Sequence, residues 1–150
     1  AGRVLVLEKA PEEDRGGNTH YSGGLLRIAF NSGEDLRPLI ADAEETVDGF
    51  FFEDVPSYTE DEFMADLMRV TSGKTDPTLA RILIGQSYNT IRWMHEYGGI
   101  PMEPAISLSA IRVGNRVKWQ KGAIVRALHE GVGLSKSWFK HCGINCSYNS

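Results

Sequence analysis

The sequence has little that would suit it to nucleic acids or to a membrane. Acidic residues outnumber basic ones by 20 to 16 among its 150 residues, so it offers no basic field to a nucleic-acid backbone. No stretch approaches the roughly 20 apolar residues that a membrane-spanning helix needs. No charged stretch leads into an apolar run and a small-residue cleavage site, as in a secretory leader. We therefore predict a cytoplasmic protein without a nucleic-acid partner or a transmembrane segment.

Cysteine is scarce as well. Cys142 and Cys146 are the only two, spaced C-x-x-x-C, with no partner cysteine or histidine in zinc-ligand spacing. Two reduced structural thiols explain the pair better than a zinc site does. We predict no metal site.

The dinucleotide fingerprint G-x-G-x-x-G is missing too. In a dinucleotide fold a strand and this turn come first, whereas residues 1–3 (AGR) read like the tail of a helix and its glycine stop before a strand. We therefore expect a chain that starts after the pyrophosphate-binding unit, or a relative that lost it.

What the chain does contain is a dense block of features over residues 3–24. Val4–Leu7 is a short apolar run, as a strand covered on both faces requires. Glu8 ends the run, and in dinucleotide folds a carboxylate there accepts hydrogen bonds from ribose hydroxyls. Gly16–Thr19 (GGNT) and Ser22–Gly24 (SGG) follow, and paired glycines let backbone N–H groups approach a flat or anionic ligand. Taken singly, each feature also suits an ordinary strand or turn.

The order and spacing of this block resemble the second strand and flavin-contacting loop of the fumarate reductase and succinate dehydrogenase flavoprotein family. Within that family, the chain most resembles the tricarballylate dehydrogenase branch in sequence. The segment from Thr75 through Trp93 to Gly98 is similar to a helix of the helical insert in these flavoproteins. Near Trp119 the family commonly has an aromatic residue followed by glycines, and here Gln120 and Lys121 replace the small residues. The resemblance covers residues 3–150.

The resemblance implies part of an FAD-dependent oxidoreductase acting on di- or tricarboxylic acids. In such enzymes a hydride moves between a substrate carbon and flavin N5. The family's substrate-binding His and Arg residues have no match here, so we predict no catalytic residue and an isolated chain that is inactive. The implied FAD contacts are Glu8 at the adenosine ribose, backbone groups of Lys9, Ala10, Gly17, Asn18 and Thr19 near the ribose and pyrophosphate, and Ser22, Gly23, Gly24 and Leu25 against the isoalloxazine ring, where N–H donors would stabilise negative charge.

Hydrophobic spacing and end signals predict the other elements. Phe50–Phe52 is expected in the core, and His95 is expected to be structural or solvated rather than catalytic, with substrate contact as the alternative for Trp93, His95 or Tyr97. A short apolar stretch is expected over 25–30, followed by helices over 36–49 and from the capping box Thr59–Glu62 to about 71. A third helix is expected from Asp76-Pro77 to Gly98, with its buried face formed by Leu79, Ile82, Leu83, Ile91 and Met94. The rest of the chain is expected to form a hairpin over 106–119 that turns at Gly114-Asn115, helices from about 123 and over 134–140, and a strand over 144–148.

Together these elements predict an α/β fold, namely a partial FAD-binding (Rossmann-like) domain with a helical insert and a β-hairpin. Residues 1–33 and 120–150 would form the core around a small, partly parallel sheet, and residues 34–119 would form the insert and hairpin. Two alternatives stay open. The chain would bind a nucleotide without chemistry, or it would be a small α/β scaffold or interaction domain that covers an open sheet edge by forming a homo-oligomer.

Overall fold

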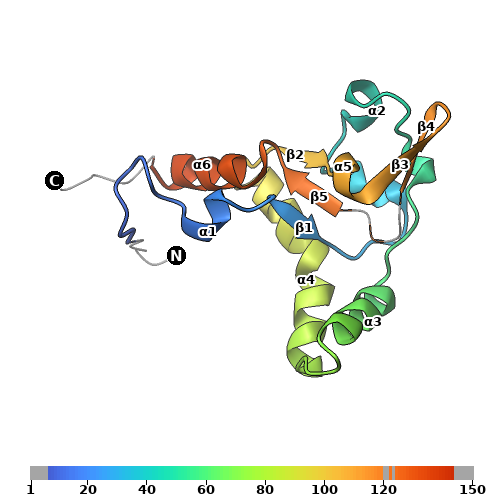
Figure 1. Cartoon of the computed structure of the whole chain (residues 1–150), viewed down its shortest axis with the longest axis horizontal. Helices are drawn as coiled ribbons and strands as arrows, with labels where there is room; N and C mark the ends of the chain where they lie inside the picture. The colour runs from blue at the N-terminus through green and yellow to red at the C-terminus, as the bar shows by residue number, and fades with distance from the viewer. Residues whose placement is uncertain (1–6, 120–121, 123, 144–150) are drawn as a thin grey trace.

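Figure 1 shows the computed structural model of the chain, which describes residues 7–119, 122 and 124–143. The chain forms both helices and strands, so the predicted mixed α/β class is confirmed. The elements are α1 (Gly17–His20), β1 (Leu25–Arg27), the 3-10 helix η1 (Gly33–Leu36), α2 (Ala43–Thr46), the 3-10 helix η2 (Phe52–Asp54), α3 (Glu60–Val70), α4 (Pro77–Glu96), β2 (Met102–Pro104), α5 (Ile106–Ser109), β3 (Ala110–Val113), β4 (Arg116–Trp119), β5 (Ile124–Ala127) and α6 (Glu130–Gly143).

The central sheet is antiparallel. Its order is β1-β5-β2, with Leu25 opposite Arg126 in one pair and Met102 opposite Ala127 in the other. The prediction of a partly parallel sheet is therefore wrong for the part of the chain that the structure describes. Most of the expected strand at 4–7 and all of the one at 144–148 lie outside the described residues, and Leu7 is in no strand and 84% exposed.

The chain from residue 124 forms a strand where a helix was predicted. β5 is the middle strand of the sheet, and Val125 and Ala127 are 1% and 0% exposed. A short apolar run has the same appearance in a buried strand and in a buried helix, so periodicity alone could not separate them. The helix α6 begins only at Glu130 and includes the predicted helix at 134–140.

The helices α3 and α4 begin where the sequence placed them. At α3 the Thr59 and Glu62 side chains each accept a bond from the other residue's backbone N–H, which completes the predicted capping box. At α4 the Asp76 carboxylate accepts the N–H groups of Thr78 and Leu79, with proline at the first helical position.

The predicted buried face of α4 is wrong in part. Ile91 is buried as expected and Met94 is half-buried, whereas Leu79, Ile82 and Leu83 are 65%, 60% and 57% exposed. The residues that face the core are Ala80, Ile84 and Ile91. The helix carries apolar residues on more than one side, so spacing alone did not identify the side that packs.

In place of the predicted helix over 36–49, the chain forms the 3-10 helix η1 and the short helix α2, with turns between them. Asp35 accepts the backbone N–H groups of Asn31 and Ser32, which starts the 3-10 helix η1 at Gly33 instead. A single helical turn, α2, follows after an interval of turns. Local side-chain bonds of this kind compete with a continuous helix.

The predicted hairpin is confirmed at its turn. β3 and β4 pair from Ala110–Trp119 to Val113–Arg116, and Gly114 has a φ of 61° between them. The stretch over 106–109 before it forms the helical turn α5 rather than a strand.

The hydrophobic core lies between the sheet, η1, η2 and the inner side of α3 and α4. Phe50 and Phe52 are 1% and 0% exposed, as expected, while Phe51 is 39% exposed and lies under the Arg116 guanidinium. Tyr58, 1% exposed, bridges the sheet to α3: its hydroxyl accepts a bond from Arg27 and donates one to Asp66.

Figure 1 shows an open arrangement with two projections from the sheet. α3 and the first half of α4 extend to one side, and α1 with α6 extends to another. β2, inside the predicted insert, pairs with β5 of the predicted core. Within the described residues, no helix is long and apolar enough to cross a membrane.

Candidate functional site

The predicted FAD contacts lie on one continuous loop that runs from Glu8 through α1 to the start of β1. α1 is a single helical turn closed by the bond from the His20 N–H to the Gly16 carbonyl. The N–H groups of Gly17, Asn18 and Thr19 precede that bond, so they have no partner within the helix. All three residues are exposed. The loop therefore presents backbone donors at its surface.

Glu8 is tied to this loop by its own carboxylate. Its Oε1 accepts the Ala10 N–H at 3.0 Å. This bond, together with bonds from the Gly16 and Lys9 N–H groups and the nearby charge of Arg15, lowers the Glu8 pKa below its ordinary value. The residue is exposed, so a carboxylate with about four acceptor positions retains room for a further donor.

The second glycine segment packs directly on the start of α6. Gly131 donates its N–H to the Ser22 carbonyl at 2.9 Å, and the Ser22 hydroxyl donates to the Thr19 carbonyl at 2.8 Å. A Cβ added to Gly24 would lie 2.6 Å from the Glu130 carbonyl carbon, and Gly24 has a φ of 61°. The backbone of the loop is in direct contact with the backbone at the start of α6, which leaves no space for side chains at Gly24 and Gly131.

Gly24 is consequently used within the protein. It is buried, its carbonyl accepts the Ala127 N–H, and its own N–H donates to the Ser22 hydroxyl. Gly17 is the opposite case: it has a φ of 50°, and a Cβ added there would meet nothing within 4 Å. Of the two, Gly17 leaves space for a ligand, and Gly24 holds the loop against α6.

The turn that supports the loop has an unusual backbone. His129 and Glu130 have φ values of 62° and 60°, a left-handed conformation that side chains disfavour. Arg126 holds Glu130 by an ion pair of 3.0 Å and also binds Glu103 at 2.7 Å. Backbone strain of this kind concentrates at ligand-binding and active sites, and here it lies directly beneath the glycine segment.

A side-chain contact joins α1 to α6 next to this turn. Ser135 is 4% exposed, its hydroxyl donates to the Val132 carbonyl, and it lies 3.3 Å from His20 Nδ1. Because the hydroxyl is already bound within the helix, the pair positions α1 rather than forming a nucleophile and its base.

The predicted site residues follow one another along this loop, and the structure assigns them different roles. Glu8, Gly17, Asn18, Thr19, Ser22 and Gly23 are exposed, and Leu25, 42% exposed, begins β1 beside them. Lys9 is exposed and Ala10 half-buried, while Gly24 is buried and faces the protein. Sequence reasoning missed the supporting turn at His129–Gly131, because only its glycine marked it.

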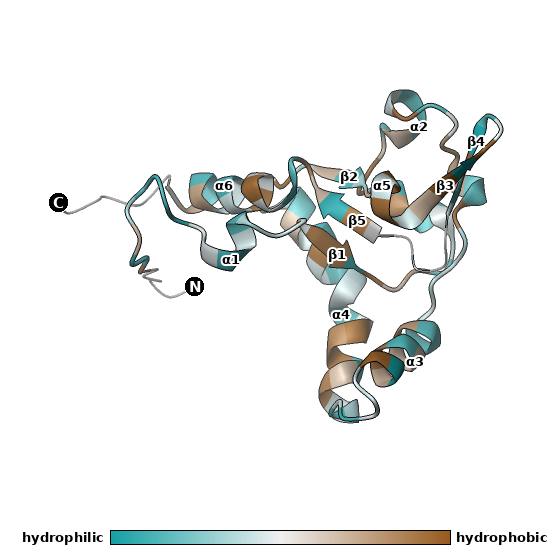
Figure 2. Cartoon of the chain, viewed as in Figure 1, coloured by the Kyte–Doolittle hydropathy of each residue, from teal (hydrophilic) through white to brown (hydrophobic). Residues whose placement is uncertain are grey.

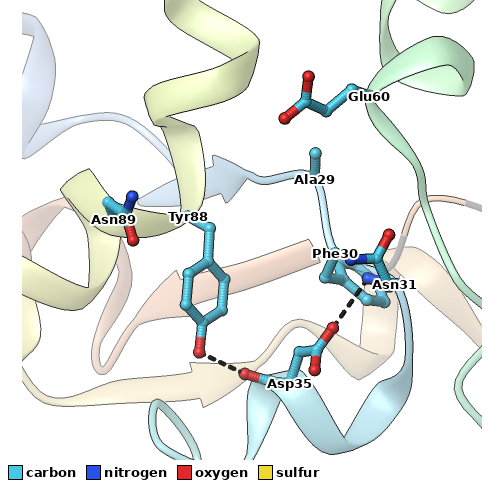
Figure 3. Close-up of a pocket in the computed structure, with 7 residues that line it drawn as sticks. All are labelled: Ala29, Phe30, Asn31, Asp35, Glu60, Tyr88 and Asn89. Carbon is cyan, nitrogen blue, oxygen red and sulfur yellow. Dashed lines mark hydrogen bonds between the residues drawn. The ribbon is translucent and has the colours of Figure 1, made fainter.

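A separate cavity of about 350 Å³ lies where the end of β1 meets α3 and α4 (Figure 3). Its floor is fixed by the Tyr88 hydroxyl, which donates to the Asp35 carbonyl at 2.6 Å. Burial raises the pKa of Tyr88 above its ordinary value. Sequence reasoning did not predict this cavity, since its residues come from four segments without a common motif. They are Ala29, Phe30, Asn31, Asp35, Glu60, Tyr88 and Asn89.

The other candidates do not add to these sites. His95 Nδ1 lies 2.9 Å from the Ile100 carbonyl at the end of α4, a structural contact. Trp93 and Tyr97 are 51% and 69% exposed, and Trp93 packs on Trp138 of α6. Cys142 is exposed, and the described residues contain no group of three or more metal-ligating side chains.

Comparison of the chain with protein-family models, curated proteins and solved structures finds no significant match in any of the three. The flavoprotein resemblance therefore stays a prediction. The geometry of the loop from Glu8 to Leu25, which we call the glycine loop, is the basis for a functional proposal.

Proposed function

We propose that this chain supplies the flavin-contacting loop of an FAD-dependent oxidoreductase acting on di- or tricarboxylic acids. The observation that carries the proposal is the glycine loop on α6. The exposed residues Gly17–Thr19 directly follow Gly16, whose N–H bonds to the Glu8 carboxylate, and the packing of Gly24 on Glu130 fixes the segment that follows. Backbone N–H groups and a carboxylate are the groups that hold a pyrophosphate and a ribose in dinucleotide sites.

The hydrogen-bonding groups of the loop are of the kinds that FAD requires. The N–H groups of Gly17, Asn18 and Thr19 suit an anionic phosphate, and the remaining acceptor position of Glu8 suits a ribose hydroxyl. FAD, when bound, supplies hydride transfer. The chain's own part is to bind and orient it, with the exposed Leu25 side chain offering apolar contact to a flat ring. Gly24 does not contact the ligand in this proposal, and it contributes by holding the loop against α6.

The proposal is tested by titrating the chain with FAD and following flavin fluorescence, with desalting to measure retention. We expect saturable binding that the change Glu8→Ala weakens at least about tenfold, equivalent to about 1.4 kcal/mol. Glu13→Ala is the matched control, because Glu13 is an exposed acid of the same loop with no assigned role. Its affinity should equal that of the unchanged chain.

Competing ligands then locate the contact. If the loop binds the adenosine and pyrophosphate part, ADP should displace FAD and riboflavin should displace it poorly. A chain that never binds FAD, or that binds it equally well with Glu8→Ala, would contradict the proposal.

A further inference from the structure

The helix α4 has two apolar sides, and only one of them is covered. Its core-facing side contains Ala80, Ile84 and Ile91, at 3%, 2% and 7% exposure. A second set of side chains recurs every three or four residues about a third of a turn away. This set, the α4 stripe, comprises Leu79, Ile82, Leu83, Gln86, Thr90, Trp93 and Tyr97.

Every residue of the α4 stripe is exposed, and among its large apolar residues only Trp93 has a ring contact within the described part of the chain, with Trp138 of α6. Leu79 is 65% exposed, Ile82 60% and Leu83 57% near the amino end of the helix, and Trp93 and Tyr97 are 51% and 69% exposed near its other end. Figure 2 shows apolar residues on the part of α4 that projects away from the sheet. None of the seven positions carries a charge.

The spacing of the α4 stripe is self-complementary. Leu79 and Trp93 are equally far from Gln86 along the helix, and so are Ile82 and Thr90. An antiparallel pair of α4 helices with a two-fold axis at Gln86 therefore places Leu79 of one copy against Trp93 of the other and Ile82 against Thr90. Leu83 then faces Asn89, and Tyr97 lies beyond the amino end of the partner helix. The Gln86 amide both donates and accepts, so two copies bond to each other at the axis.

The exposed apolar area of the α4 stripe would supply most of one partner's share of such an interface. Five large apolar side chains, each more than half exposed, present on the order of 600 Å². This is at the upper limit of the largest apolar patch on an ordinary monomer, about 300–600 Å². With the polar rim it approaches the roughly 800 Å² that each partner contributes to a standard interface.

We propose that a second copy of this chain covers the α4 stripe, giving a two-fold dimer through antiparallel α4 helices. The inference is independent of flavin binding, because the glycine loop and the stripe share no residue.

Sedimentation velocity over a range of concentrations tests the proposal. We expect a concentration-dependent dimer whose dissociation constant rises at least about tenfold with Ile82→Glu, since a charge would then be buried at the interface. Leu108→Glu is the matched control: Leu108 is 58% exposed, similar to Ile82, but lies on α5. Circular dichroism checks that both variants retain their helices.

A cross-link tests the register. In a background with Cys142→Ser and Cys146→Ser, Gln86→Cys should form a disulfide-linked dimer under mild oxidation, because helices packed about 8–10 Å apart bring facing Cα atoms within disulfide reach. Arg92→Cys, on the same helix but off the stripe, should not. A monomer at every concentration, or a dimer that Ile82→Glu leaves unchanged, would overturn the proposal, and cross-linking at Arg92 alone would overturn the register.

Discussion

Replacing Gly131 with alanine should destabilise the protein, although glycine-to-alanine changes inside helices usually do the reverse. Alanine ordinarily gains about 0.5–1 kcal/mol because glycine loses more backbone freedom on folding. At Gly131 the new Cβ would lie 2.0 Å from the Thr19 carbonyl oxygen and 2.5 Å from the Ser22 carbonyl oxygen. Both obstacles are backbone, so they can move only if the glycine loop moves off α6.

The magnitude follows from those two opposing effects. Overpacking against fixed structure costs about 1–3 kcal/mol, and the propensity gain offsets up to about 1 kcal/mol. We therefore expect the free energy of unfolding to fall by about 1–2 kcal/mol, measured by urea denaturation followed by circular dichroism.

Gly85→Ala is the matched control. Gly85 lies inside α4, where an added Cβ would meet only the Glu60 carboxylate oxygens, at 3.8 and 3.9 Å. This change should raise the unfolding free energy by about 0.5–1 kcal/mol. If the two changes shifted the urea midpoint in the same direction, the close backbone contact between the loop and α6 would be refuted.

Three further changes address other contacts. Tyr58→Phe removes a buried hydroxyl bonded to Arg27 and Asp66 and should cost about 1–2 kcal/mol in urea denaturation, and no change would mean that water replaces both bonds fully. Asp76→Ala removes the cap of α4 and should cost about 1 kcal/mol, while Asp76→Ser should retain most of the stability and thereby separate capping from charge. Bonds from Arg69 and Tyr58 lower the pKa of Asp66, so its stabilising contribution is present above the unfolded-state pKa near 3.8 and is lost as pH falls through the lower folded-state pKa. The urea midpoint of Asp66→Asn should therefore fall less on acidification than that of the unchanged chain, and parallel pH curves would show that this carboxylate is not involved.

The sequence predicted elements whose ends are set by nearby residues. Thr59 and Glu62 define the start of α3, Asp76 defines that of α4, and the hairpin turns at Gly114, and all three depend on residues within a few positions. These signals act over one turn of chain, so they are readable without knowledge of the rest of the fold.

The elements that the sequence misplaced depend on distant partners. β5 is a strand because β1 and β2 flank it, and no local signal near Val125 specifies either neighbour. The same holds at the candidate site. The glycines of the loop were visible as a motif, but the reason for Gly24, namely its contact with Glu130, comes from more than a hundred residues further along the chain.

The strand order β1-β5-β2 also governs when the sheet can form. Both outer strands precede the middle strand in the chain, and Leu25 waits for a partner, Arg126, about a hundred residues later. During synthesis α3 and α4 can pair early, because their contacts are local, but β1 and β2 have nothing to join until β5 has emerged. We expect assembly of the sheet to be the slow, late step of folding, with the helical hairpin formed before it.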